Sequence, residues 1–96
     1  EHDFFFLHIK KTDSYGEDGN LEGKAGVIEE VDAEIPRLLA LRPDVLVVTG
    51  DHSTPCAMKG HSWHPVPTLV SSAVCGRDGA SRFDEAECSN GGQRLN

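Results

Sequence analysis

The sequence predicts an α/β fold with a parallel β-α-β unit that forms part of a doubly wound sheet. Val45–Val48 is an unbroken apolar run, which is typical of a strand buried on both faces. A Phe-rich stretch, Asp3–Ile9, predicts an earlier strand, and apolar residues from Leu21 to Leu38 recur with a helical period between the two. Strand, helix and strand in this order form a right-handed crossover with parallel strands.

The segment between the first strand and the helix, Lys10–Asn20, is polar and rich in glycine, which predicts a loop. From Leu21 the three- and four-residue steps mark one face of an amphipathic helix, and Asn20 is a suitable N-cap. Pro36 lacks an N–H group and predicts a kink or a new turn. Arg42–Asp44, which contains Pro43, should end the helix and lead into the second strand.

The C-terminal third predicts one more strand and one more helix. Pro65–Pro67 favours an extended path, and Thr68–Val70, or a run as far as Ser72, is a third strand or an edge. Ser81–Asp84 resembles a capping box that opens a short helix over Arg82–Cys88. Gly91–Gly92 should follow the end of that helix.

Composition limits the classes of protein that fit. With 96 residues, 38% apolar and 26% charged, the chain is within the range of a single globular domain. The net charge of -7 disfavours binding to nucleic acid or to an anionic membrane surface, and no apolar run approaches the roughly 20 residues of a membrane span. Because the chain lacks an initiating Met and reaches its first apolar run within a few residues, we expect that it is truncated at its N-terminus.

The three cysteines have no C-x-x-C spacing and are odd in number. This pattern argues against a zinc ribbon and against a disulfide framework, and it favours the reducing cytoplasm. Each cysteine fits a small buried apolar position. His8, inside the predicted first strand, is interpreted as a core histidine rather than a ligand.

Metal-ligand residues follow the second predicted strand. Asp51 and His52 come directly after Thr49 and Gly50, and His61 follows nine residues later. In doubly wound sheets, functional groups gather at the carboxyl ends of the strands. Adjacent residues on a straight strand point to opposite faces, so we expect the backbone to bend at Gly50 if both side chains reach one ion.

A second group of candidate ligands follows the first predicted strand, in a loop that should reach the same edge of the sheet. Its carboxylates are Asp13, Glu17 and Asp18. Mixed carboxylate and imidazole ligands suit manganese, zinc, cobalt or iron, and manganese tolerates the oxygen-rich share best. Two such groups on one edge suggest a two-metal site of the kind used in phosphoryl transfer.

Three segments carry a resemblance to a known family: LHIKKTDSYGEDG, VVTGDHSTPCAMKGHSWHPVP and FDEAECSNGG. They resemble the C-terminal part of the archaeal-type, 2,3-bisphosphoglycerate-independent phosphoglycerate mutases of the alkaline phosphatase superfamily. The similarity runs over nearly the whole chain, and T-G-D-H-S-T-P-C followed by H-S-x-x-P-V-P is its specific part, whereas an Asp-His pair alone would not be specific. It implies an alkaline-phosphatase-like fold in which residues 1–96 are the C-terminal part of the metal-binding domain.

The resemblance also implies a set of ligands for two divalent ions. Asp13, Glu17 and His61 would hold one ion, and Asp51 and His52 would contribute to the other, together with an aspartate and a nucleophilic serine outside this chain. The family usually has histidine at the position of Glu17, in a D-x-x-G-H pattern. Glutamate there favours Mn²⁺ or Mg²⁺ over Zn²⁺, and Co²⁺ remains an alternative.

The implied reaction moves the phosphoryl group of 3-phosphoglycerate to the serine and then to the 2-hydroxyl group, as a step of glycolysis in the cytoplasm. Lys10 or Lys11 would contact the phosphate or the carboxylate of the substrate. Without the serine, the 96-residue chain alone is expected to be inactive, and the rest of the enzyme chain is its expected partner.

Simpler interpretations remain for each candidate. Asp51 and His52 fit a capped turn after a strand, Asp13 fits an Asx turn, and Glu17 and His61 fit solvated loop positions. His64 is expected to lie outside the ligand set. A phosphohydrolase or a phosphopentomutase of the same superfamily would use the same ligands. A metal-binding module without catalytic activity, or one that self-associates through exposed sheet edges, is a further alternative.

Overall fold

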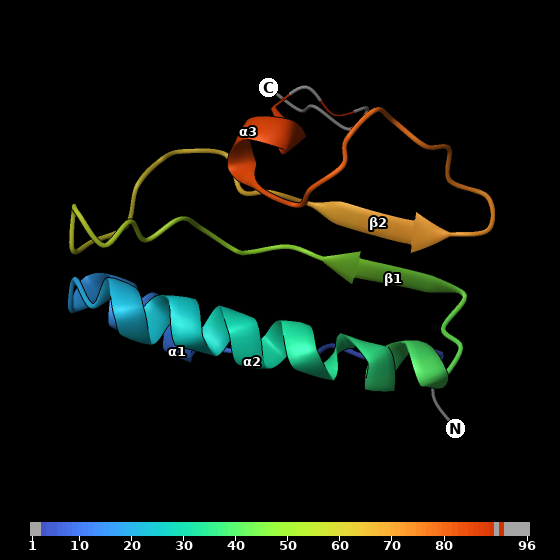
Figure 1. Cartoon of the computed structure of the whole chain (residues 1–96), viewed down its shortest axis with the longest axis horizontal. Coiled ribbons are helices and arrows are strands. Elements are labelled where there is room, and N and C mark those ends of the chain that lie inside the picture. The colour runs from blue at the N-terminus through green and yellow to red at the C-terminus, as the bar shows by residue number, and fades with distance from the viewer. Residues whose placement is uncertain (1–2, 90, 92–96) are drawn as a thin grey trace. The chain divides into compact units, whose positions relative to one another are not determined.

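The computed structural model describes residues 3–89 and 91 and has an α/β composition (Figure 1). Its elements, in chain order, are α1 (Lys11–Glu17), α2 (Leu21–Ala40), β1 (Val45–Val48), β2 (Leu69–Ser72) and α3 (Glu85–Cys88). The chain divides into two compact units. The first unit consists of Glu1–Glu34 and Thr54–Ser62, and the second of Ile35–Ser53 and Trp63–Asn96.

The first unit contains a helix where the sequence predicts a loop. α1 begins after Lys10, whose carbonyl oxygen accepts hydrogen bonds from the N–H groups of Asp13 and Ser14. The prediction was wrong because Gly16 indicated a turn, whereas this glycine is helical and buried. A Cβ at Gly16 would clash with the carbonyl oxygen of Thr54, so the glycine permits close packing instead of a reversal of the chain.

The predicted strand Asp3–Ile9 is not present: these residues form no regular element. Phe4, Phe5 and Phe6 are 81%, 77% and 76% exposed. A strand needs a neighbouring strand to pair its N–H and C=O groups, and within the described part of the chain the only ladder joins β1 and β2. The apolar composition of this segment is therefore not enough to make it a strand here.

Helix α2 confirms the predicted amphipathic helix and its start. The Asn20 side chain accepts a hydrogen bond of 2.9 Å from the N–H of Gly23, which is the expected capping contact. The helix passes through Pro36 and ends at Ala40, so Pro36 does not end it. Its apolar face is only partly covered: Leu21 and Ile28 are 69% and 53% exposed, whereas Val31 is half-buried.

In the second unit, β1 has the bounds that the sequence predicts, but its partner and its burial differ. β1 pairs with β2 in antiparallel register, with Val45 opposite Ser72 and Val48 opposite Leu69 (Figure 1). The predicted parallel β-α-β unit is therefore not formed among residues 3–89 and 91. Burial on both faces is also wrong, because the residues of β1 alternate between exposed and half-buried.

The last helix, α3, is shorter than predicted and begins later. Asp84 is its N-cap, and the Asp84 side chain accepts a hydrogen bond of 2.8 Å from the N–H of Glu87. Ser81 therefore does not open the helix. Helix α3 ends at Cys88, ahead of Gly91, and Gly92 lies outside the described residues.

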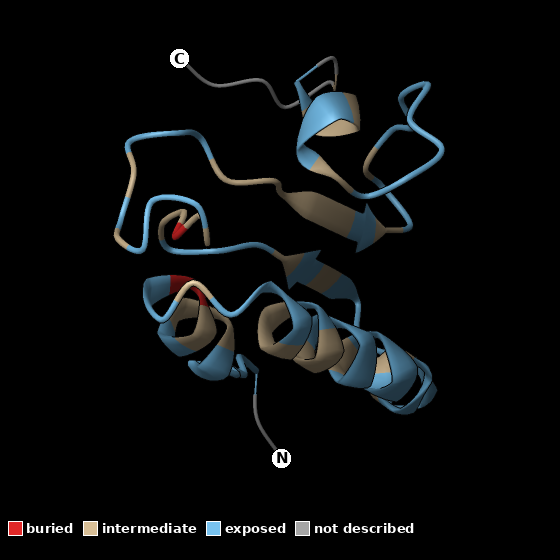
Figure 2. Cartoon of the chain, turned by 60° about the vertical axis from the view of Figure 1, so that its left-hand side comes forward, coloured by how far each residue is buried: buried red, intermediate tan, exposed pale blue. Residues whose placement is uncertain are grey.

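Burial is confined to one polar contact. Among the described residues no apolar side chain is buried, and the buried positions are Gly16 and Thr54 (Figure 2). Both belong to the first unit, where α1 meets the Thr54–Ser62 loop. The best-defined packing in the first unit is therefore the contact between Gly16 of α1 and Thr54. None of the described helices is both long and apolar enough to cross a membrane.

Candidate metal centre

A carboxylate and an imidazole from distant parts of the sequence meet in the first unit. Asp13 lies in the first turn of α1, and His61 lies in the Thr54–Ser62 loop. The Nε2 atom of His61 is 3.2 Å from Oδ1 of Asp13. Two ligands of one ion, each bonded at about 2.1 Å, lie about 3.0–3.4 Å apart. This pair therefore has the spacing that a shared divalent ion requires.

Glu17 lies next to this pair because of the helical repeat. It is four positions after Asp13 on α1, and residues at this spacing lie on the same face of a helix. Its Oε1 atom is 3.9 Å from Nε2 of His61. The Glu17 and His61 side chains are 51% and 56% exposed, whereas that of Asp13 is 16% exposed. Two carboxylates and one imidazole thus converge, with Asp13 as the most protected donor.

Thr54 also contacts the Asp13 carboxylate. Its hydroxyl group donates a hydrogen bond of 2.6 Å to Oδ1 of Asp13, the same oxygen that faces His61. The backbone oxygen of Thr54 accepts a hydrogen bond of 2.8 Å from Nζ of Lys24 on α2. The sequence analysis did not identify Thr54 or Lys24. The available signal was the glycine at position 16, which admits Thr54 but was interpreted as part of a loop.

Lys10 lies at the edge of the same group. Its Nζ atom is 3.5 Å from Oδ2 of Asp13, and its side chain is 72% exposed. An exposed ion pair of this kind contributes about 0–1 kcal/mol. Its position is compatible with the predicted contact to an anionic substrate, but in this structure its partner is Asp13.

The second predicted pair lies in the second unit, immediately after β1. Nε2 of His52 is 3.6 Å from Oδ2 of Asp51, and the N–H of His52 donates to Oδ1 of Asp51 at 3.1 Å. The two side chains therefore lie on the same side of the chain, as the prediction requires. The Gly50 backbone does not adopt the left-handed conformation, so this arrangement does not depend on the special freedom of glycine.

The remaining candidates have local roles. Asp18 is the C-cap residue of α1. The ring of His64 stacks on that of Trp63 at a centroid distance of 4.9 Å. The backbone oxygen of His64 accepts a hydrogen bond from the Ser53 hydroxyl group. The ring of His8 lies 6.4 Å from that of Phe6 in an exposed segment, so His8 is not the core histidine that the sequence suggests.

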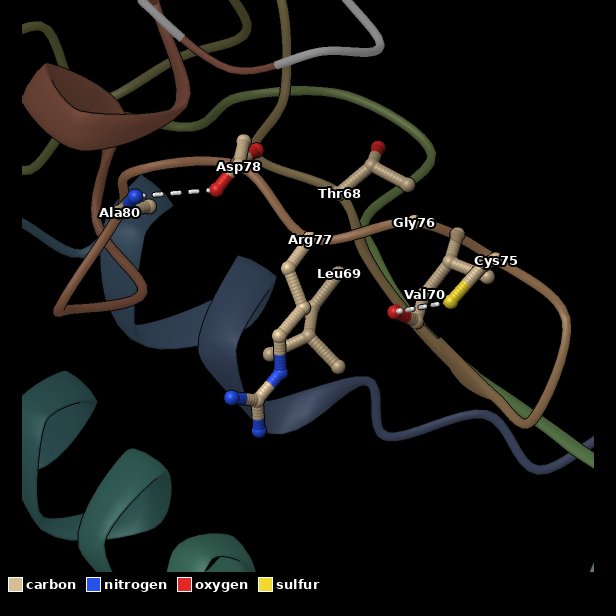
Figure 3. Close-up of a pocket in the computed structure, with 8 residues that line it drawn as sticks. All are labelled: Thr68, Leu69, Val70, Cys75, Gly76, Arg77, Asp78 and Ala80. Carbon is tan, nitrogen blue, oxygen red and sulfur yellow. Dashed lines mark hydrogen bonds between the residues drawn. The ribbon is translucent and has the colours of Figure 1, made fainter.

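A cavity of about 810 Å³ lies in the second unit and contains none of the predicted ligands. It is lined by Thr68, Leu69, Val70, Cys75, Gly76, Arg77, Asp78 and Ala80 (Figure 3). The Sγ atom of Cys75 points towards the carbonyl oxygen of Val70, 3.7 Å away. Hydrogen bonding with Ser72, mainly with its side chain, lowers the pKa of the Cys75 thiol below its usual value. Cys75 is a free cysteine, as are Cys56 and Cys88, and all three are half-buried, so the predicted buried positions are wrong.

A comparison with known families places the chain in a family of metal-dependent enzymes. A model of the Metalloenzyme superfamily matches residues 1–92, and the chain belongs to this superfamily. Membership implies a divalent metal ion, and the Asp13–His61 pair is a suitable donor set for one.

Individual relatives connect the chain with one kind of enzyme. It is 62% identical over 91 residues to a protein of Aquifex aeolicus named "Probable 2,3-bisphosphoglycerate-independent phosphoglycerate mutase". Proteins of the same name from Thermosipho africanus and Thermus thermophilus are 62% and 54% identical. The match covers 95% of this chain but 22% of the Aquifex protein, so the chain spans less than a quarter of the length of such relatives. The family resemblance of the sequence motifs is thereby confirmed.

A solved structure also has this fold. The PH0037 protein from Pyrococcus horikoshii superimposes on the chain with a TM-score of 0.88 and is 43% identical to it. The match covers 94% of this chain and 28% of that protein.

Proposed function

We propose that residues 1–96 are the C-terminal, metal-binding part of a phosphoglycerate mutase that interconverts 3-phosphoglycerate and 2-phosphoglycerate. The names of the relatives support the activity, and the 3.2 Å contact between His61 and Asp13 is the observation that supports the metal site. In this proposal the nucleophilic serine belongs to a segment of the enzyme outside these residues. The chain alone would then have ligands but no mutase activity.

Asp13, Glu17 and His61 would hold one ion, and Asp51 and His52 would contribute to a second. The carboxylate-rich set with Glu17 favours Mn²⁺, with Mg²⁺, Co²⁺ or Zn²⁺ as alternatives. When bound, such ions lower the pKa of a nucleophilic hydroxyl group and neutralise charge on the phosphoryl oxygens.

The residues of this chain would bind the metal ions and help to orient the substrate. Asp13 and Glu17 present carboxylate oxygens from one face of α1, and His61 presents Nε2 from the loop. Lys10 lies beside this group with an exposed ammonium group, where it would attract the anionic substrate. In the proposed reaction, the serine hydroxyl would lose its proton and bond to phosphorus, the bond from phosphorus to the 3-oxygen would break, and the 3-oxygen would take up a proton. The 2-hydroxyl group would then lose its proton and bond to phosphorus, and the serine oxygen would leave and be protonated again.

Further properties follow from the same proposal. In the longer polypeptide, β1 would join a larger, doubly wound sheet, which would cover its exposed Val45 and Val47 side chains. The three free cysteines favour a cytoplasmic enzyme, as expected for glycolysis. The rest of the enzyme chain is then the main partner of these residues, in place of a second copy.

A chimeric enzyme would test the proposal. The matching segment of the Aquifex aeolicus protein, 62% identical over 91 residues, is replaced by this chain, and formation of 2-phosphoglycerate is followed in a coupled assay with Mn²⁺. The chimera should be active, and His61→Ala or Asp13→Ala should lower kcat/KM at least about 100-fold. His64→Gln is the matched control and should retain activity.

Two further measurements on the chimera, of free phosphate and of activity on a pentose phosphate, separate the alternatives. Release of free phosphate without 2-phosphoglycerate would favour a phosphohydrolase, and activity on a pentose phosphate would favour a phosphopentomutase. An active chimera that is unaffected by His61→Ala and Asp13→Ala would contradict the proposed metal site.

A further inference from the structure

We infer that Thr54 is a positioning residue that orients the Asp13 carboxylate for metal binding. The inference rests on the proposed metal site in the first unit. Thr54 is 4% exposed and is the buried polar residue among those that the structure describes. Its hydroxyl group donates to the carboxylate oxygen that faces His61.

Thr54 is fixed from two further directions. Nζ of Lys24 donates to its backbone oxygen at 2.8 Å, and the backbone of Gly16 lies so close to the same oxygen that no Cβ would fit. The hydroxyl group is therefore held in place by α1 and α2 together. It has one proton to donate, and that proton is directed at Oδ1 of Asp13.

The hydrogen bond from Thr54 is the stronger constraint on Asp13. A short hydrogen bond from a hydroxyl group to a carboxylate is about twice as strong as a hydrogen bond between neutral groups. The competing contact from Lys10 is longer, at 3.5 Å, and its ammonium group is exposed to water, which screens it. Of these two contacts, the one from Thr54 therefore restricts rotation of the Asp13 carboxylate more.

This control matters because metal sites depend on groups that hold the ligands in place. Removal of such a group typically weakens metal binding 10–100-fold, even though it never contacts the ion. Without Thr54, the carboxylate would have to be ordered when the ion binds. With it, one carboxylate oxygen is already 3.2 Å from Nε2 of His61.

Two substitutions at position 54 separate positioning from packing. Thr54→Val keeps the shape and removes the hydroxyl group, whereas Thr54→Ser keeps the hydroxyl group and removes the methyl group. Mn²⁺ affinity of the 96-residue chain is measured by electron paramagnetic resonance, with circular dichroism of the metal-free protein as the check on folding. We expect Thr54→Val to weaken Mn²⁺ binding about 10–100-fold and Thr54→Ser to remain within about 3-fold of the wild type.

If Thr54→Val loses helical signal, the same affinities are measured for Lys24→Met, which keeps the hydroxyl group but releases the Thr54 carbonyl. That variant should bind Mn²⁺ about 3–10-fold more weakly. Equal losses in Thr54→Val and Thr54→Ser would indicate a packing role and overturn the inference, as would unchanged affinity in folded Thr54→Val or in Lys24→Met.

A third variant distinguishes failure of the inference from failure of the proposed metal site. If His61→Ala leaves Mn²⁺ affinity unchanged, the proposed site is wrong and the inference is overturned with it. If His61→Ala abolishes binding while Thr54→Val does not weaken it, the metal site stands and only the positioning role is lost.

Discussion

The ammonium group of Lys24 donates a 2.8 Å hydrogen bond to the backbone oxygen of Thr54, and this contact joins α2 to the loop that carries His61. The two residues are 30 positions apart in the sequence. Thr54 also donates a hydrogen bond to Asp13. Lys24, which is not a candidate ligand, is therefore linked through Thr54 to the Asp13 carboxylate.

Lys24→Met should destabilise the first unit. A hydrogen bond to a charged group contributes about 1.5–3 kcal/mol, and methionine retains most of the aliphatic length, so a loss of about 1–2 kcal/mol is expected. Urea unfolding followed by the helical signal measures it. Lys11→Met, at an exposed position of α1, is the control and should change stability by less than about 0.5 kcal/mol. Equal effects of both substitutions would contradict the contact's role.

Gly16→Ala and Gly26→Ala should have opposite effects although both glycines are helical. The new Cβ at Gly16 would clash with the Thr54 carbonyl oxygen, whereas nothing lies within 4 Å of the corresponding atom at Gly26. We expect Gly16→Ala to cost about 1–3 kcal/mol and Gly26→Ala to stabilise by up to about 1 kcal/mol. Urea unfolding of the two variants tests this, and a stabilised Gly16→Ala protein would rule out the close approach.

Glu17→His should change the metal preference. Replacing a carboxylate by an imidazole next to His61 favours zinc over manganese. The ratio of the Mn²⁺ to the Zn²⁺ dissociation constant should rise at least about 10-fold, measured by competition with a chelating dye. Glu29→His, on an exposed part of α2, is the matched control. A similar shift in both variants would point to adventitious binding by the added histidine.

Ser72→Ala should slow the alkylation of Cys75. Hydrogen bonding with the Ser72 side chain is the main cause that lowers the pKa of this thiol, so a larger fraction of it is thiolate at a given pH than in the absence of that side chain. Loss of the hydroxyl group should move the midpoint of the alkylation rate with iodoacetamide to higher pH. The profile of Cys88 in the same samples should not change. A Cys75 midpoint that stays in place would show that Ser72 does not act on the thiol.

The elements that the sequence predicted well are those with local signals. β1 has its predicted bounds because four apolar residues lie between Pro43 and Gly50, and α2 begins where Asn20 can cap it. These signals do not depend on distant parts of the chain. The contact between Asp13 and His61 also agrees with the predicted grouping of ligands, and the ligand roles themselves remain predictions.

The errors concern features that depend on distant partners. The strand predicted for Asp3–Ile9 needs a neighbouring ladder, and the direction of β1 depends on which segment pairs with it. The helical state of α1 was missed because Gly16 admits a backbone atom of Thr54, a contact that no local pattern contains. Thr54 was missed for the same reason.

The burial pattern also has a calorimetric consequence. Since the described apolar side chains are at most half-buried, unfolding of the 96-residue chain will expose less new hydrocarbon than unfolding of a compact domain of this size. Ordinary domains gain about 12–15 cal/mol/K per residue in heat capacity on unfolding, largely from this source. The isolated chain should therefore show a smaller increment per residue, measured by differential scanning calorimetry.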